Sequence, residues 1–316
     1  MVDIEKNPYK ADFPLLAGHP ELAFLDSAAT AQRPACALDA ERDFYTQMNA
    51  NPLRGLYSLS VRATSEIAAV RKQIAELIGA VDEAGKPAAD DIVFTRNTSE
   101  SLNLVAKSFA PTVLGAGDEV AVTIMEHHSD LIPWQQACRA AGATLVLLYP
   151  DDQGVIRDEE IAAKIGPKTR IVAVTEVSNV LGVRNPVEKI AEAAHAQGAY
   201  VVVDGAQSVP HMTVDVRELG VDFLAFSAHK ALGPMGIGVL WGRHELLDAM
   251  PPMLTGGEMI DSVTEQDATW APVPEKFEAG TQDAAGIYAT GAALTYLTRT
   301  VGYDAVAARE AALVAY

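Results

Sequence analysis

The stretch AYVVVDGAQSVPHMTVDVRELGVDFLAFSAHK (residues 199–230) contains two short apolar runs, and each leads directly into polar residues. The runs are AYVVVD (199–204) and DFLAFS (222–227). Apolar residues occupy successive positions in both, which is typical of strands that are covered on both faces. Such short runs, bounded by turn residues, favour β-strands over helices. This stretch therefore predicts two buried strands of a mainly parallel sheet.

The same pattern continues on both sides of this stretch. Further apolar runs predict strands at DIVFTR (91–96), EVAVTI (119–124), TLVLLY (144–149), RIVAVTEV (170–177) and GIGVLWG (236–242). The longer amphipathic stretches between the runs predict helices at 99–110, 131–141, 158–165, 186–197 and 243–249. Strands that alternate with helices build a parallel sheet from βα units. The sequence predicts an α/β fold with helices on both faces of a central sheet.

The flanking regions predict more helices and one irregular segment. Residues 63–79 carry apolar side chains at helical spacing, and 284–300 and 303–316 are again helical. Residues 251–280 are rich in Gly, Pro and acidic residues, so we expect a long excursion over the surface. We expect three parts: an N-terminal arm (1–24), a large α/β domain (25–300), and the start of a small C-terminal domain (301–316) that is largely missing from this sequence.

The composition limits the partners of the protein. Its 316 residues include 24 Lys or Arg and 42 Asp or Glu, which gives a net charge of −18 at pH 7. A chain this acidic lacks a basic stripe that could neutralise phosphates, so we expect no nucleic acid and no membrane as a partner. The 49% of hydrophobic residues indicates a folded chain and not a disordered acidic one.

Cysteine usage and the N-terminal sequence favour a soluble, cytoplasmic protein. Cys36 and Cys138 are the two cysteines, and neither belongs to a CxxC pair, which argues against a disulfide framework or a structural zinc site. The stretch MVDIEKNPYKADFPLLAG (1–18) carries charges where a signal peptide needs an unbroken apolar region. The longest apolar runs are too short to span a membrane.

Polar side chains follow five of the predicted strands. In open α/β sheets, ligands bind beyond the carboxyl ends of the strands. Amides, hydroxyls, imidazoles, carboxylates and a lysine occupy these positions, at 97–100, 126–128, 178–179, 205–207 and 227–230, with Asp204 ending its own strand. So many functional groups at strand ends predict one composite site.

Nucleotide and metal sites fit these residues poorly. A dinucleotide site needs GxGxxG at the start of a helix, whereas the nearest string, GAGDEV (115–120), lacks the third glycine and precedes its strand. The P-loop motif is absent from the sequence. His127 and His128 are adjacent, so on an extended chain they point to opposite sides, and no carboxylate spacing accompanies them. We therefore expect no metal.

A phosphate-bearing aromatic cofactor that is bound covalently by a lysine fits better. Lys230 follows a strand and is preceded by Ser227 and His229, which can donate to a phosphate, as a site for pyridoxal 5′-phosphate (PLP) requires. Asp204 can pair with the protonated pyridine nitrogen. An unpaired lysine or aspartate in a buried position is costly, so one cofactor that satisfies both explains their joint placement.

Other strand-end residues can complete this site. Thr98 and Ser99, at the start of a predicted helix, present hydroxyl and backbone N–H groups to the phosphate. Gln207 can reach the phenolic oxygen of the ring, and His127 can stack on the ring face.

A resemblance to a known family rests on six strings of the sequence. They are LDSAATAQRP (25–34), EHHSDLIPW (126–134), VSNVLG (177–182), VDGAQS (203–208), FSAHKALGPMGIGVL (226–240) and FEAGTQD (277–283). These strings resemble the class V, fold-type I PLP enzymes, and within that class the SUF-type cysteine desulfurases and selenocysteine lyases. The resemblance extends from about Tyr9 to the end of the chain. It implies removal of sulfur from L-cysteine, which yields L-alanine and a persulfide for iron–sulfur cluster assembly.

The resemblance implies a role for each matching residue. It makes Lys230 the lysine that binds PLP covalently, Asp204 the partner of the pyridine nitrogen and Gln207 the contact of the phenolate. It makes His127 the residue that stacks on the ring and donates a proton. Asn179 matches a residue near the substrate carboxylate and the ring.

The remaining matches concern the phosphate, the substrate channel and the partners. Ser99, Ser227 and His229 match phosphate ligands, and Arg54 matches an arginine of the substrate channel. Thr281 matches a ligand that the neighbouring subunit supplies, so the resemblance implies a homodimer with shared active sites. It also implies a soluble sulfur acceptor or scaffold protein, and L-selenocysteine as an alternative substrate.

This sequence departs from the family pattern in two respects. Leu53 stands where the family often has a histidine before the Arg-Gly pair, which alters one channel contact. In the family, the cysteine that takes the sulfur and the arginine that binds the substrate carboxylate belong to the small C-terminal domain, and we find no substitute here. Cys36 and Cys138 are both expected to be core thiols.

Three hypotheses about function follow. The first is a cysteine desulfurase whose sulfur-accepting cysteine is absent from this chain, which we therefore expect to be incomplete for turnover. The second is another class V lyase or aminotransferase, such as a selenocysteine lyase, that uses no catalytic cysteine. The third is a short, non-catalytic homologue that acts as a binding partner.

Overall fold

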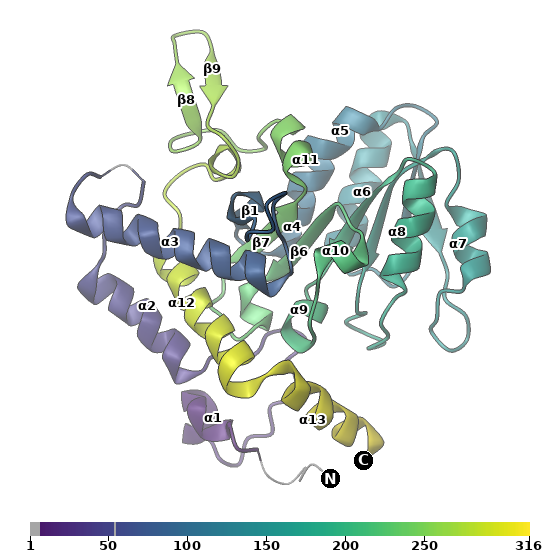
Figure 1. Ribbon diagram of the computed structural model, residues 1–316. Helices are drawn as coiled ribbons and strands as arrows, with labels where there is room; N and C mark the ends of the chain where they lie inside the picture. The colour runs from purple at the N-terminus through teal and green to yellow at the C-terminus, as the bar shows by residue number, and fades with distance from the viewer. Residues whose placement is uncertain (1–6, 54) are drawn as a thin grey trace.

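A central seven-stranded sheet organises the protein, whose computed structural model describes residues 7–53 and 55–316 (Figure 1). In the order in which they lie side by side, the strands are β1 (Ile92–Thr95), β7 (Gly238–Gly242), β6 (Phe223–Ser227), β5 (Tyr200–Asp204), β4 (Thr169–Thr175), β2 (Glu119–Thr123) and β3 (Thr144–Leu148). Each strand overlaps one of the apolar runs that predict it.

The sheet is mainly parallel, which confirms the predicted fold class. Neighbouring strands from β3 through β2, β4 and β5 to β6 pair in parallel, whereas β7 is antiparallel to both β6 and β1. Helical connections return the chain to the same edge of the sheet between the parallel strands. Because β7 alone runs in the opposite direction, the carboxyl ends of β1, β2, β4, β5 and β6 lie at one edge.

Helices cover both faces of this sheet (Figure 1). One face packs against α4 (Thr98–Leu104), the π-helical segment η3 (Val105–Phe109), α5 (Ala110–Val113), α6 (His128–Ala141) and α11 (His244–Ala249). The layer over the other face contains α3 (Ser58–Leu77), α7 (Asp158–Lys164), α8 (Val187–Ala196), α9 (Ser208–His211), α10 (Val216–Leu219) and α12 (Ala284–Thr295). Helix α2 (Ala35–Gln47) belongs to the same core and packs against α12.

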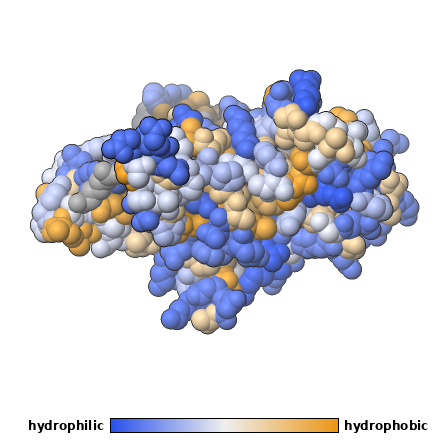
Figure 2. All heavy atoms as spheres, turned by 90° about the horizontal axis from the view of Figure 1, so that it is seen from above, coloured by the Kyte–Doolittle hydropathy of each residue, from blue (hydrophilic) through white to orange (hydrophobic). Residues whose placement is uncertain are grey.

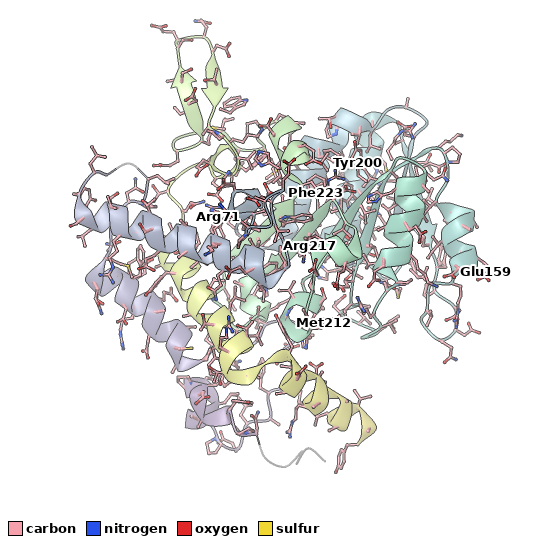
Figure 3. The ribbon with its side chains drawn as sticks, in the orientation of Figure 1. Arg71, Glu159, Tyr200, Met212, Arg217 and Phe223 are labelled. Carbon is pink, nitrogen blue, oxygen red and sulfur yellow. The ribbon has the colours of Figure 1, made fainter. Side chains whose placement is uncertain are left out.

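Successive residues of a central strand enter different cores, which explains the unbroken apolar runs. On β5, Val201 and Val203 belong to the core beneath α8, while Val202 belongs to the core beneath α6. Tyr200 and Phe223, which are labelled in Figure 3, both contact the ring of Phe109, with centroid distances of 4.9 and 5.0 Å. Both faces are therefore buried, as the sequence pattern indicates.

Two helices begin three or more residues earlier than the sequence predicts. Helix α6 begins at His128 and not at Leu131, because the Nδ1 atom of His127 accepts a hydrogen bond from the backbone N–H of Ser129 and caps the helix. Helix α3 begins at Ser58, five residues before the predicted start. Its first turns bury little apart from Ser60 and Ala63, so they carry no apolar periodicity.

Helix α2 and a β-hairpin have no counterpart among the predicted elements. Helix α2 buries Ala37 and Phe44 and lies beside α12. The hairpin, β8 (Ile260–Val263) and β9 (Ala268–Trp270), lies in the segment expected to be irregular and projects from the body of the molecule (Figure 1).

The two ends of the described chain lie on the same side of the molecule (Figure 1). Helix α12 continues into a π-helical segment, η6 (Tyr296–Val301), and then into α13 (Tyr303–Ala315). The hydroxyl of Tyr296 donates to Asp12 in η1 (Lys10–Asp12), at 2.6 Å, close to the short helix α1 (Pro14–Gly18). Three further short turns complete the elements: η2 (Ala89–Asp91), η4 (Ala228–Lys230) and η5 (Glu275–Phe277).

The face shown in Figure 2 is mostly hydrophilic, with separate hydrophobic patches. This agrees with the excess of acidic residues in the composition. Within residues 7–53 and 55–316, no helix combines the length and the apolar character that crossing a bilayer requires.

Candidate functional site

The carboxyl ends of the strands open into one cavity of about 530 Å³. Such a volume lies in the range of small-molecule and cofactor sites. The residues predicted for the site that line this cavity are Thr98, Ser99, His127, Asn179, Asp204, Ser227, His229 and Lys230. Residues far apart in the sequence therefore meet because parallel strands end at the same edge.

Asp204 and Lys230 place opposite charges on this cavity. Asp204 is buried at the end of β5, where its Oδ1 accepts a hydrogen bond from the backbone N–H of Ala206 at 2.9 Å. Lys230 follows β6 in the turn η4 and is partly buried. Among the described residues, neither side chain makes an ion pair. Two charged groups that face one cavity without pairing are suited to a ligand that contacts both.

Burial shifts the pKa values of both groups. Desolvation raises the pKa of Asp204, although the hydrogen bond from Ala206 and the charge of Lys230 lower it. Desolvation lowers the pKa of Lys230, and the charge of Asp204 acts in the opposite direction. The amine of Lys230 is therefore easier to deprotonate than that of a surface lysine, as a nucleophilic lysine requires.

Hydroxyl groups form one wall of the cavity, where β6 and α4 meet. The backbone N–H of Thr98 donates to Ser227 Oγ at 2.8 Å, and the hydroxyls of Thr98 and Ser227 lie 2.6 Å apart. The hydroxyls of Ser99 and Ser129 lie 2.5 Å apart. This cluster offers several O–H donors to an anionic oxygen.

His127 lines the cavity from the turn between β2 and α6. Its Nδ1 accepts from the backbone N–H of Ser129 at 3.1 Å, so the proton of the neutral ring resides on Nε2. Burial, and then the charge of Lys230, lower the pKa of His127. The neutral ring can therefore stack on an aromatic ligand and donate a hydrogen bond from Nε2. Asn179 borders both this cavity and a neighbouring one of about 560 Å³.

The N-terminal segment 26–31 covers one side of the site. The backbone N–H of Ala31 donates to the carbonyl of His229 at 3.0 Å, and the Nδ1 of His229 lies 3.1 Å from the hydroxyl of Thr30. Gln207 does not line the cavity, because its Nε2 donates to the carbonyl of Ala28 at 2.9 Å.

Several lining residues were not predicted as site residues from the sequence. They are Asp26, Ala28, Ala29, Asn97, Ser129 and Ala206. Asn97 and Ala206 belong to the strand-end set, and the others belong to strings that carry the family resemblance. The family strings were the sequence signal that could have identified these residues, because their contacts in the site join distant parts of the chain.

Thr281 is not among the described residues that line this cavity. Thr281 lines a separate cavity of about 210 Å³, together with Arg96 and Glu278. Arg54 lies outside the described residues.

The two cysteines differ from each other in exposure. Cys138 is buried in α6, as expected. Cys36 is exposed in the first turn of α2, so the expectation of a core thiol is wrong for this residue. Desolvation raises the pKa of both thiols, and neither residue lines the cavity.

Comparisons with known proteins agree with this geometry. The family model described as Aminotransferase class-V matches residues 23–316. A cysteine desulfurase from Dickeya dadantii is 48% identical over 312 residues, which cover 97% of this chain and 74% of that protein. The crystal structure of a cysteine desulfurase from Escherichia coli superposes with a TM-score of 0.84 and 38% identity, over 95% of this chain and 72% of that chain.

Two similar structures are of C-DES, a cystine C–S lyase, and both are 25% identical to this chain. One contains glycine covalently linked to the PLP cofactor, with a TM-score of 0.80 over 94% of this chain and 76% of that chain. The other contains the reaction product cysteine persulfide, with a TM-score of 0.79 over 92% and 75% of the two chains. PLP is the cofactor of the family. The chain therefore belongs to the class-V aminotransferase family, and within it to the cysteine desulfurases.

Proposed function

We propose that this protein is a PLP-dependent cysteine desulfurase that removes sulfur from L-cysteine and leaves L-alanine. One structural observation supports the proposal independently of sequence similarity. Asp204 and Lys230 face one cavity without pairing with each other, beside a cluster of hydroxyl groups. A cofactor with a basic ring nitrogen, an aldehyde and a phosphate would satisfy all of these groups together.

The residues present fit PLP. In this proposal Asp204 holds the pyridine nitrogen, Lys230 binds the aldehyde carbon, and His127 stacks on the ring. The phosphate would be held by Thr98, Ser99, Ser227 and His229. When bound, PLP supplies an electron sink for the bond electrons at the substrate α-carbon.

Other side chains prepare this site for the substrate. Lys230 holds an amine of lowered pKa, and His127 holds a proton at Nε2 that it can donate. Asn179 stands at the border of two cavities, where a substrate carboxylate could approach. In this proposal Gln207, whose Nε2 donates one hydrogen bond to the carbonyl of Ala28, contacts the phenolic oxygen through the second N–H of its amide.

We also propose how the site relates to a second subunit, to the substrate channel and to partner proteins. We place Thr281 in the active site of a neighbouring subunit, since it borders a different cavity from Lys230. This implies a homodimer with shared sites, with Arg54 in the substrate channel. We also propose a cytoplasmic location, a separate sulfur acceptor or scaffold protein, and a contribution to iron–sulfur cluster assembly.

Lysine substitution tests the cofactor site. The purified protein should show a visible absorption band that disappears in Lys230→Ala. Lys72→Ala is the matched control, because Lys72 is exposed on α3 and pairs with Glu76 at 3.7 Å. An unchanged band in Lys230→Ala would contradict the assignment.

Product analysis tests the reaction. With L-cysteine and two equivalents of a small thiol, desulfuration yields alanine, hydrogen sulfide and the disulfide of the thiol. The thiol is needed because neither Cys36 nor Cys138 lines the cavity. Parallel reactions with L-selenocysteine establish the preferred substrate.

A C–S lyase is the second candidate, since two of the similar structures are of a cystine C–S lyase. Elimination from cystine needs no protein thiol and would give pyruvate, ammonia and cysteine persulfide. Pyruvate without alanine would therefore support the lyase and exclude the desulfurase. The absence of both products would favour a non-catalytic role.

A further inference from the structure

Two buried carboxyl groups flank His127 at the base of the site. Glu126 precedes it in the turn after β2, and Asp130 lies in the first turn of α6. Both side chains are buried, and Asp130 is fully so. Glu126 Oε2 and Asp130 Oδ2 have no hydrogen-bond donor of normal geometry among the described residues. Unpartnered buried carboxyl oxygens are costly and call for an explanation.

The second oxygen of each group has a donor. The hydroxyl of Thr123 donates to Glu126 Oε1 at 2.6 Å, and the indole N–H of Trp134 donates to Asp130 Oδ1 at 2.8 Å. The two carboxyl groups also interact electrostatically, since after burial the charge of Glu126 is the largest influence that raises the pKa of Asp130. Because ionised carboxylates only accept hydrogen bonds, a bond between them requires a proton on one of the two.

The surroundings favour the retention of this proton. Burial raises the pKa of Glu126 to about 7. Burial, followed by the charges of Glu126 and Asp204, raises the pKa of Asp130. Burial raises the pKa of Asp204 itself, while the charges of Lys230 and His127 lower it. Hydrogen bonds have the opposite effect: those from Thr123 and the backbone of Thr175 lower the pKa of Glu126, and the one from Trp134 lowers the pKa of Asp130. Among the described residues, no cation forms an ion pair with either carboxyl group.

A hydrogen bond between the two oxygens without a donor would span His127, the residue that presents its ring to the cavity. The backbone N–H of Asp130 also donates to the carbonyl of His127, at 2.8 Å. We propose that Glu126 and Asp130 are positioning residues, which share one proton and thereby close the turn that holds His127 against the cavity. Loss of the shared proton would place two carboxylates in contact and open this turn. The inference rests on the proposed role of His127 at the cofactor.

An amide at either position would keep the contact without the shared proton. In Asp130→Asn, the amide oxygen can accept from Trp134 while the NH₂ group donates to Glu126. In Glu126→Gln, the amide oxygen can accept from Thr123 while the NH₂ group donates to Asp130. Glu159→Gln is a matched control, because Glu159 is exposed on α7 at the edge of the molecule (Figure 3).

The first measurement is the dissociation constant of PLP between pH 6.5 and 8.5, determined from absorbance. From pH 6.5 to 8.5, the ratio of the wild-type dissociation constant to that of Asp130→Asn should increase by about threefold or more. Glu159→Gln should follow the wild type. The difference should vanish in a His127→Gln background, because the pair acts through His127. Glu126→Gln is measured in the same way and replaces Asp130→Asn if that variant does not fold.

The second measurement is urea unfolding of the cofactor-free protein. A carboxyl group whose pKa is raised by folding stabilises the protein below its unfolded pKa, and this contribution is lost as the pH rises through the folded pKa. The urea midpoint of the wild type should therefore fall more between pH 5.5 and 8.5 than that of either amide variant.

Equal pH dependence in the wild type and both amide variants would overturn the shared proton. A difference that persists in His127→Gln would overturn the positioning role. Neither readout depends on turnover of L-cysteine, so failure of the desulfurase proposal would be recognised separately.

Discussion

Arg71 and Glu278 form a two-pronged ion pair inside the protein, with Nη1–Oε1 and Nη2–Oε2 distances of 2.7 and 2.9 Å. Their side chains are 9% and 2% exposed, so water screens the pair very little. Glu278 Oε1 also accepts from the backbone N–H of Phe94, at 2.6 Å. The pair thus joins α3 and β1 to the segment that carries Thr281. Figure 3 shows Arg71 on the side of α3 that faces the sheet.

Loss of one partner of this pair should destabilise the fold. Glu278→Gln leaves the guanidinium of Arg71 buried without its carboxylate, and we expect a loss of about 3–5 kcal/mol in the free energy of unfolding. Urea unfolding measures this loss. Glu76→Gln, which breaks the exposed pair with Lys72, should cost less than about 1 kcal/mol. A loss in Glu278→Gln no larger than in this control would contradict the structural role.

Asp204 should control how tightly PLP binds. In Asp204→Asn, the charge-assisted hydrogen bond to the ring nitrogen is replaced by a neutral one, so we expect PLP to bind about 10- to 100-fold more weakly. Equilibrium dialysis of the purified protein measures the affinity. The exposed residue Asp158 provides the control variant Asp158→Asn. Unchanged affinity in Asp204→Asn would place the ring nitrogen elsewhere.

The lowered pKa of Lys230 predicts how fast PLP attaches at different pH values. The free amine is the reactive form, so the rate of attachment should rise with pH and level off once the amine is deprotonated. The midpoint should lie below the usual lysine value, because burial disfavours the charged amine. Asp204→Asn should lower the midpoint further, since the charge of Asp204 favours protonation. Stopped-flow absorbance can follow the reaction, and a midpoint that rises in this variant would contradict the argument.

The fold could be predicted from sequence where burial is two-sided. Strands such as β5 bury every residue beyond Tyr200, and the resulting apolar run is visible without any structure. Helix α2 buries Ala37 and Phe44, and its packing surface is completed by α12 from the other end of the chain. The hairpin β8–β9 is largely exposed, so neither strand shows a clear alternation.

The residues of the candidate site also differ in how well the sequence predicts them. Residues that directly follow strands, such as Asp204 and Lys230, could be predicted because the topology brings strand ends together. Ala28 reaches the site through a hydrogen bond from Gln207, 179 residues away in sequence, and no local pattern indicates this contact. The shared proton between Glu126 and Asp130 depends on burial that only the tertiary structure reveals.

The two cysteines should differ in reactivity, and neither should take part in the reaction. An aromatic disulfide reagent should modify one thiol per native chain, because Cys36 is exposed and Cys138 is buried. Both thiols should react after unfolding in denaturant. Cys36→Ser should abolish the reaction of the native protein and leave thiol-dependent alanine formation unchanged, since Cys36 does not line the cavity. Loss of alanine formation in Cys36→Ser would instead show that this thiol reaches the substrate, which would require a rearrangement of α2.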